Sequence, residues 1–327
     1  MIRNSLVVAV LLAVLTTGAL AADGDGGYAG AFLQVPIGAR PTALGGAYVA
    51  VSNDGAGVLY NPAGLTAIKQ LLFSSSYRAM QLDRKLGYVN FLIPVEGEAT
   101  LGFSYLYAGS GSVTARDADG YALDRDFSFN NHDFSVIFAK RFEKYLSLGG
   151  RLHFYYARFP EVDATSVGFD IGGMLHIDEL INRETREFMP VRDIQIGLLV
   201  KHISVKYPWN SQEYNIRYTT DDVGYVQDDR VPIEVALGAS ARFLEQKLLL
   251  TTDLSKNEKQ AAEFHGGAEY FISPEFALRG GYGDKRLTAG TGYVFKFGKR
   301  LFAVDYAFST DKADEGSEHI FSFDLLF

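Results

Sequence analysis

Residues 317–327 read Ser-Glu-His-Ile-Phe-Ser-Phe-Asp-Leu-Leu-Phe. One face of this stretch is apolar and consists of Phe321, Phe323, Leu325 and Phe327. The opposite face carries polar side chains at Glu318, Ser322 and Asp324. Because successive side chains of a strand point to opposite sides, such a strand fits between lipid hydrocarbon and a wet lumen. The stretch therefore predicts a strand of a transmembrane β-barrel.

The same alternation recurs after residue 68 and predicts an all-β, antiparallel barrel of about 14 strands. Its clearest hairpin joins 286–297 to 301–310. Under this count, five tight connections fall at one end of the barrel, at Glu96-Gly97, Glu143-Lys144, Leu244-Glu245, Ser273-Pro274 and Gly298-Lys299. The two longest connections, 109–131 and 204–229, fall at the other end, and bacterial barrels place their long loops outside. Only 178–190, long and charged with the pattern of a short helix, breaks this sorting.

The N-terminal residues have the pattern of a cleaved export signal, which we expect at 1–21. Arg3 precedes an apolar run at 6–15, and Ala19-Leu20-Ala21 provides the small residues of a cleavage site. The run is shorter than the roughly 20 residues that span a bilayer.

With 24 Phe, 19 Tyr and 34 Gly, the composition suits an exported sheet protein. The formal net charge of −8 without any basic run argues against a nucleic-acid partner, and the lack of cysteine excludes disulfides.

Residues 22–66 are small, Gly-rich and only loosely periodic, which predicts a compact segment with tight turns. Four motifs follow one another there: Gly38-Ala39-Arg40-Pro41, Gly45-Gly46-Ala47, Asn53-Asp54 and Asn61-Pro62-Ala63-Gly64-Leu65. This succession resembles the FadL-like family of outer-membrane barrels, and most closely its PorV/PorQ branch. The resemblance implies an N-terminal hatch at 22–66 tucked into a 14-stranded barrel at 67–327. Its hatch motif would comprise Gly38, Arg40, Gly45, Gly46, Asp54, Asn61, Pro62 and Gly64.

The aromatic C-terminal residue resembles the signal by which Gram-negative outer-membrane barrels are recognised for assembly. It implies a location in the outer membrane, contact with its lipid, and the barrel assembly machinery as a partner that recognises Phe323, Leu325 and Phe327.

For function, the family resemblance implies first a PorV/PorQ-like accessory that binds or hands over exported client proteins, as in type IX secretion. The alternative is a FadL-like passive transporter of long-chain fatty acids or other hydrophobic molecules. An outer-membrane hydrolase is a third candidate.

Residues suited to catalysis are few, and we expect no enzyme and no cofactor. The six histidines lie outside Gly-x-Ser-x-Gly and His-Glu-x-x-His motifs. Glu263, His265 and Glu269 share one strand face, which allows metal binding or acid–base chemistry but is also expected of a polar lumen wall. Acidic outer connections lack the later Gly and Glu of a calcium loop, and contain Asp117, Asp119, Asp124, Asp126, Asp221, Asp222, Asp228 and Asp229.

One loop is rich in aromatic residues and is the candidate contact for a ligand or a partner: Tyr207, Trp209, Tyr214, Tyr218 and Tyr225. These rings would equally suit an interfacial belt. Inward-facing charges of mixed sign predict ion pairs across the lumen, at Arg151, Asp170, Arg279, Arg286, Asp305, Glu318 and Asp324. Gly149-Gly150 and Gly172-Gly173 lie inside strands, where glycine marks a wall kink that either opens laterally or accommodates the hatch.

Overall fold

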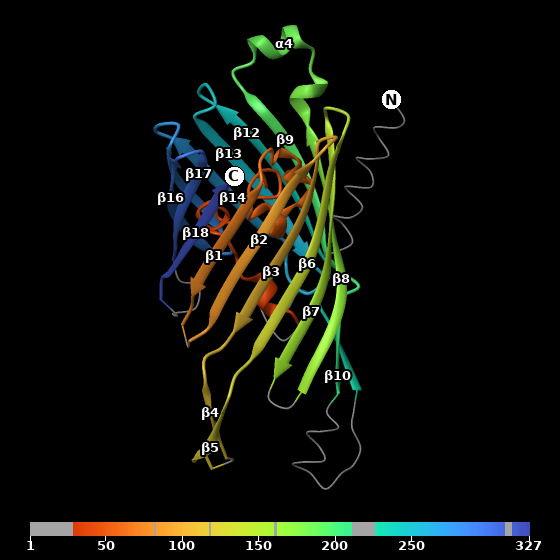
Figure 1. The fold of residues 1–327 in the computed structure, drawn as a ribbon, viewed down its shortest axis with the longest axis vertical. Coiled ribbons are helices and arrows are strands. Elements are labelled where there is room, and N and C mark those ends of the chain that lie inside the picture. Colours follow the sequence, from red (N-terminus) through yellow and green to blue (C-terminus); the bar gives the residue numbers. More distant parts are fainter. Residues whose placement is uncertain (1–28, 82, 118, 160–161, 211–225, 311–315) are drawn as a thin grey trace.

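The main body of the chain is a closed antiparallel barrel of 14 strands (Figure 1). The computed structural model describes residues 29–81, 83–117, 119–159, 162–210, 226–310 and 316–327. Its barrel strands are β1 (Leu72–Ala79), β2 (Lys85–Val95), β3 (Ala99–Gly109), β6 (Asn130–Phe142), β7 (Leu146–Phe159), β8 (Val162–His176), β9 (Arg192–Ile203), β12 (Glu234–Phe243), β13 (Leu248–Asn257), β14 (Glu263–Phe271), β15 (Phe276–Gly283), β16 (Arg286–Phe297), β17 (Arg300–Ser309) and β18 (Glu318–Leu326). The barrel closes where β1 pairs with β18. The predicted fold class and strand number are confirmed, whereas the predicted signal peptide lies outside the described residues.

Alternation along each strand separates an apolar outer wall from a polar inner wall. In β18, Phe321 and Phe323 are 47% and 51% exposed, while Ile320, which precedes Phe321, is fully buried. The same holds in β16, where the outward Leu287 and Tyr293 are 63% and 50% exposed. Because the barrel is closed, its strands satisfy one another's backbone hydrogen bonds, as a wall in hydrocarbon requires.

The connections sort to two ends as predicted. The five tight turns predicted above lie at the end that carries η3 (Ile177–Leu180, a 3₁₀ helix) and α4 (Arg183–Phe188), at the top of Figure 1. The longest connections form two hairpins that project from the opposite end, β4 (Val113–Arg116) with β5 (Ala122–Phe127) and β10 (Lys206–Asn210) with β11 (Val226–Arg230). In the described part of the chain, no helix is long and apolar enough to span a membrane.

Residues 29–68, which we call the hatch, precede β1 and lie inside the barrel (Figure 1). The hatch consists of short helical pieces: η1 (Ala31–Gln34), α2 (Ala39–Ala43), α3 (Gly57–Tyr60) and η2 (Pro62–Ala67). Its apolar side chains supply the core. Leu65 and Ile68 pack with the inward-facing Leu92 and Ile137 of the wall. The lumen is therefore filled by packed chain next to the wall rather than by strand side chains alone.

Deleting Phe327 is expected to lower the amount of barrel in the outer membrane several-fold while leaving the assembled barrel intact. The Phe327 ring lies 4.9 Å from the Arg300 guanidinium, and its N–H donates to the Leu71 carbonyl, so the finished barrel loses little. Immunoblots of membrane fractions, with and without boiling, measure both quantities. Phe321→Ala removes a lipid-facing ring of similar exposure from the same strand. An equal drop in that variant would contradict a special role for the terminal residue.

Candidate functional site

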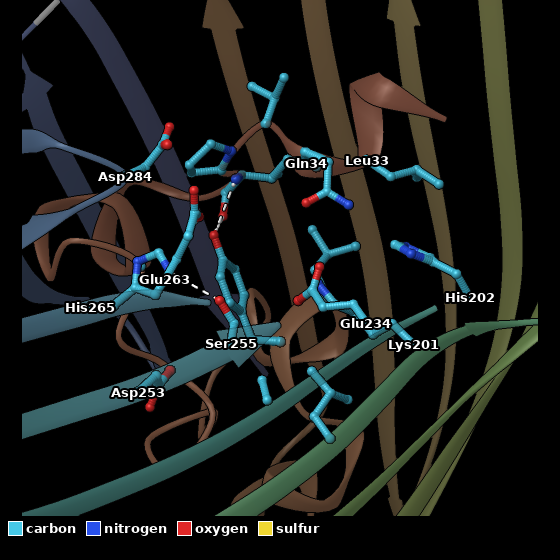
Figure 2. A pocket seen from close by; sticks show the side chains of 18 of the residues that line it. Leu33, Gln34, Lys201, His202, Glu234, Asp253, Ser255, Glu263, His265 and Asp284 are labelled. Atoms are coloured by element: carbon cyan, nitrogen blue, oxygen red, sulfur yellow. Dashed lines mark hydrogen bonds and ion pairs between the residues drawn. The ribbon is translucent and has the colours of Figure 1, made fainter. Parts of the chain in front are cut away.

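A cavity of about 280 Å³ lies between the hatch and the inner wall of the barrel (Figure 2). The hatch lines it mainly with apolar side chains, among them Leu33, Val35 and Leu59. The strands line it mainly with charged and polar side chains, including Lys201, Glu234 and His265. The cavity is thus apolar on its hatch side and polar on its wall side.

The charges of the cavity wall form close ion pairs, which confirms the mixed-sign lumen predicted from the sequence. Lys201 Nζ lies 2.8 Å from Glu234 Oε1, and these two residues are cross-strand partners in β9 and β12. Glu318 accepts from Arg286 at 2.9 Å and also pairs with Arg78. Arg78 in turn donates to the Pro36 carbonyl at 2.6 Å and so ties the hatch to β1.

A buried cluster around His153 joins four strands beside the cavity. His153 Nε2 lies 2.7 Å from Asp170 and its Nδ1 lies 3.0 Å from Asp133, which also accepts from Arg151 at 2.8 Å. The other oxygen of Asp170 accepts from the backbone N–H of His202 at 2.9 Å. His202 has a positive φ of 62°, and the register between β8 and β9 shifts next to Asp170. The cluster therefore fixes a local irregularity of the wall.

Arg40 connects the hatch to the barrel through a two-pronged ion pair. Its Nε and one terminal nitrogen lie 2.8 Å and 2.9 Å from the two carboxylate oxygens of Glu269 on β14. Its other terminal nitrogen donates to Asp54 at 3.0 Å, so the predicted hatch residues Arg40 and Asp54 meet. Burial alone would lower the pKa of Arg40, but the neighbouring Glu269 and Asp54 carboxylates outweigh it and raise that pKa. Arg40 is held as a largely buried cation between hatch and wall, with 12% of its side chain exposed.

The hatch backbone rests on a row of inward-facing glycines, which we call the seat glycines. A Cβ built on any of them would overlap a hatch atom: Gly149, Gly172, Gly197, Gly238, Gly267, Gly281, Gly283 and Gly290. They lie on β7, β8, β9, β12, β14, β15 and β16, which are neighbours around the barrel apart from the interposed β13. On β13 the contact is Asp253, whose carboxylate accepts from the N–H groups of Tyr48 and Val49 at 2.6 Å and 2.8 Å. The wall is thus shaped to hold the hatch closely.

The remaining predicted hatch residues lie at turns or at this seat. Asn61 caps η2 through Ala63 N–H at 3.1 Å and donates to the Gly173 carbonyl of β8 at 3.2 Å. Pro62 packs on Gly149, which shows that the glycine pairs predicted to kink the wall accommodate the hatch. Positive φ or close approach to backbone explains the glycines of the motif: Gly38 at 92°, Gly45 at 67°, Gly46 at 85°, and Gly64 against the Ser52 carbonyl.

Aromatic rings form a continuous row, the aromatic ladder, from the projecting hairpins to the cavity. Successive ring centroids are 5.7, 4.8, 5.2, 5.6 and 6.2 Å apart along Phe127, Phe129, Phe159, Trp209, Tyr207 and Tyr155. Tyr155 then stacks on the cavity residue His153 at 5.0 Å. The hatch residue Leu33 packs against the inner end of the ladder.

Of the predicted aromatic loop, the structure describes Tyr207 and Trp209. Tyr207 is only 2% exposed, because the alternation of β10 points it inward onto Tyr155. Tyr214, Tyr218 and Tyr225 lie outside the described residues. No motif in the sequence marks the ladder's other members, because Phe127 and Phe129 lie in the connection between β3 and β6, whereas Phe159 ends β7. Their common feature, an aromatic ring at or next to the end of a strand, could have indicated them.

Glu263, His265 and Glu269 form part of the polar lumen wall. His265 Nδ1 lies 2.8 Å from the Gly45 carbonyl, and Glu269 binds Arg40, so two of the three contact the hatch. Glu263 Oε2 is 4.0 Å from His265 Nε2. Among the described residues, no group of three side chains is placed to hold a metal ion.

The fold and the site together define a transmembrane β-barrel whose lumen holds a hatch and a small cavity.

No protein-family model matches the sequence, and no curated protein is similar to it in sequence. Similar solved structures include the toluene transporter TbuX of Ralstonia pickettii, 13% identical over 89% of this chain and 98% of that chain, with a TM-score of 0.61. The toluene transporter TodX of P. putida is 11% identical over 89% and 98%, with a TM-score of 0.60. A FadL homologue of Pseudomonas aeruginosa is 12% identical over 90% and 98%, with a TM-score of 0.58. The chain therefore shares the FadL-like fold, while its assignment to the PorV/PorQ branch stays a prediction.

Proposed function

We propose that the protein is a non-enzymatic outer-membrane channel through which small hydrophobic molecules, aromatic ones in particular, pass passively. The observation that carries this proposal is the aromatic ladder, which leads from the projecting hairpins to the cavity beside the hatch. Ring faces and edges offer favourable contacts to another ring along such a row. The toluene transporters with the same fold support the same class of cargo.

The ladder also favours this function over an accessory role in protein secretion, our first expectation from the sequence. Tyr207 and Trp209 are the two described members of the five candidate aromatics for contacting a client protein, and they pack on each other and on the barrel's own Tyr155 and Phe159. The client-binding role and the PorV/PorQ assignment remain predictions without such an observation. Export by a cleaved signal peptide and insertion by the barrel assembly machinery are part of the proposal.

Uptake of radiolabelled toluene by a Gram-negative host without a hydrocarbon channel of its own tests the function. The protein is expected to speed uptake, and Phe159→Ala with Trp209→Ala is expected to reduce that gain about five- to tenfold, since aromatic contacts contribute roughly 0.5–1.5 kcal/mol each. Phe138→Ala with Phe154→Ala is the matched control, because these rings face outward and are 51% and 45% exposed. Uptake no faster than in cells without the protein, at verified surface levels, would refute the channel.

A further inference from the structure

The cavity is close to electrically balanced. Five basic and six acidic side chains line it, and the main ones are already paired with one another. Lys201 is paired with Glu234, and Arg286 with Glu318. The carboxylate of Asp253 accepts from two hatch N–H groups. A charged ligand would therefore enter the cavity without a free counter-ion and would lose its hydration.

The cavity nevertheless offers both a hydrogen-bond donor and an acceptor. Gln34 lines the cavity from η1, and its Nε2 is buried with no hydrogen-bond partner among the described residues. Glu234 lines the same cavity from β12, and Figure 2 shows both side chains in the space between hatch and wall. The hatch also lines the cavity with the apolar Leu33, Val35 and Leu59. A hydroxyl group could accept from the amide and donate to the carboxylate, while a ring contacts the apolar side.

We propose that the ligand of this cavity is a small, uncharged molecule with one hydroxyl group on an apolar ring, of the phenol type, rather than a plain hydrocarbon or an organic acid. This inference rests on the proposed function and specifies its cargo. A cavity of about 280 Å³ suits a single substituted ring, since pockets for drug-sized ligands begin near this size. A plain hydrocarbon would leave the Gln34 amide without a partner, and sites built to bind a hydroxyl discriminate against analogues that lack it.

Fluorine NMR titrations on the purified full chain in detergent test the proposal with three probes: para-fluorophenol, fluorobenzene and para-fluorobenzoate. The unaltered protein is expected to bind para-fluorophenol about tenfold more tightly than either of the others, the effect of one or two good hydrogen bonds. The triple variant Gln34→Leu, Lys201→Met and Glu234→Leu makes the site apolar without leaving a lone charge. In this variant the preference for para-fluorophenol over fluorobenzene should fall to about one.

The control is Lys206→Met with Asp228→Leu, which removes an exposed ion pair of the β10–β11 hairpin with a 2.7 Å separation and should leave the preference unchanged. Heat-modifiability on gels verifies that each variant is folded. The inference would be overturned if the unaltered protein bound para-fluorophenol and fluorobenzene with equal affinity, or bound para-fluorobenzoate more tightly than para-fluorophenol. Either result would do so even if toluene uptake supports the channel. If the purified protein prefers para-fluorophenol but cells that contain it show no faster toluene uptake, the proposed channel function is overturned and the ligand proposal stands.

Discussion

Alanine at both Gly149 and Gly172 is expected to loosen the hatch and to raise the conductance of the barrel. A Cβ on Gly149 would overlap the backbone of Pro62, and one on Gly172 would overlap Oδ1 of Asn61. The hatch cannot move away without losing a bond to the wall, because Asn61 also donates to the Gly173 carbonyl of β8 at 3.2 Å. Overpacking costs about 1–3 kcal/mol at each site, and the wall itself keeps its closed ladder. Single-channel recording in planar bilayers and protease digestion of the hatch measure the effect.

The adjacent glycines provide a matched control for this experiment. Gly150 and Gly173 are the outward members of the same two pairs, and the nearest atom to a Cβ on either lies 3.8 Å or 3.6 Å away. Gly150→Ala with Gly173→Ala should therefore conduct like the unaltered protein. If the inward and outward double variants show the same conductance and the same hatch digestion, the seat glycines do not hold the hatch.

The barrel could be predicted from the sequence because lipid on one side and polar lumen on the other impose a period of two on every strand. In β18 this pattern identified the outward Phe321 and Phe323 correctly. Turn lengths then fixed the two ends, since a wrong strand count would have mixed short and long connections. The hatch became visible through its glycines and Asn61-Pro62, whose backbone requirements are local.

Contacts between distant segments could not be predicted in this way. Asp253 reads as an ordinary inward position of β13, and only the fold brings it to the Tyr48 N–H, 205 residues earlier in the chain. Likewise, the alternation of β10 could indicate that Tyr207 faces one side, but which side depends on how β10 packs beside β7 and β8. The seat glycines left a readable signal, because glycine recurs at inward positions of neighbouring strands. Recognising it requires knowing that another backbone lies inside the barrel.

Arg40→Met is expected to release the hatch and raise conductance through the loss of a buried ion pair. Methionine keeps much of the apolar stem of Arg40 but leaves Glu269, fully buried, with Arg279 as its remaining ion-pair partner at 2.7 Å, and leaves Asp54 without its cation. Removing one member of a buried pair typically costs about 3–5 kcal/mol. Since Arg40 belongs to the hatch and Glu269 to the wall, losing the pair destabilises the hatch in its position inside the barrel. Conductance in planar bilayers should rise, and hatch digestion should become faster.

Two further variants separate the loss of this contact from a mere change of lumen charge. Arg40→Lys keeps the charge but cannot donate to both oxygens of Glu269 from a planar fork, so an intermediate conductance is expected. Arg286→Met removes one inward-facing positive charge from a residue whose ion pairs, with Glu318 and Asp284, are within the wall. It should leave hatch digestion unchanged, because Glu318 retains Arg78. Should Arg286→Met speed hatch digestion as much as Arg40→Met does, the hatch responds to the charge of the lumen as a whole, and Arg40 is not its attachment to the wall.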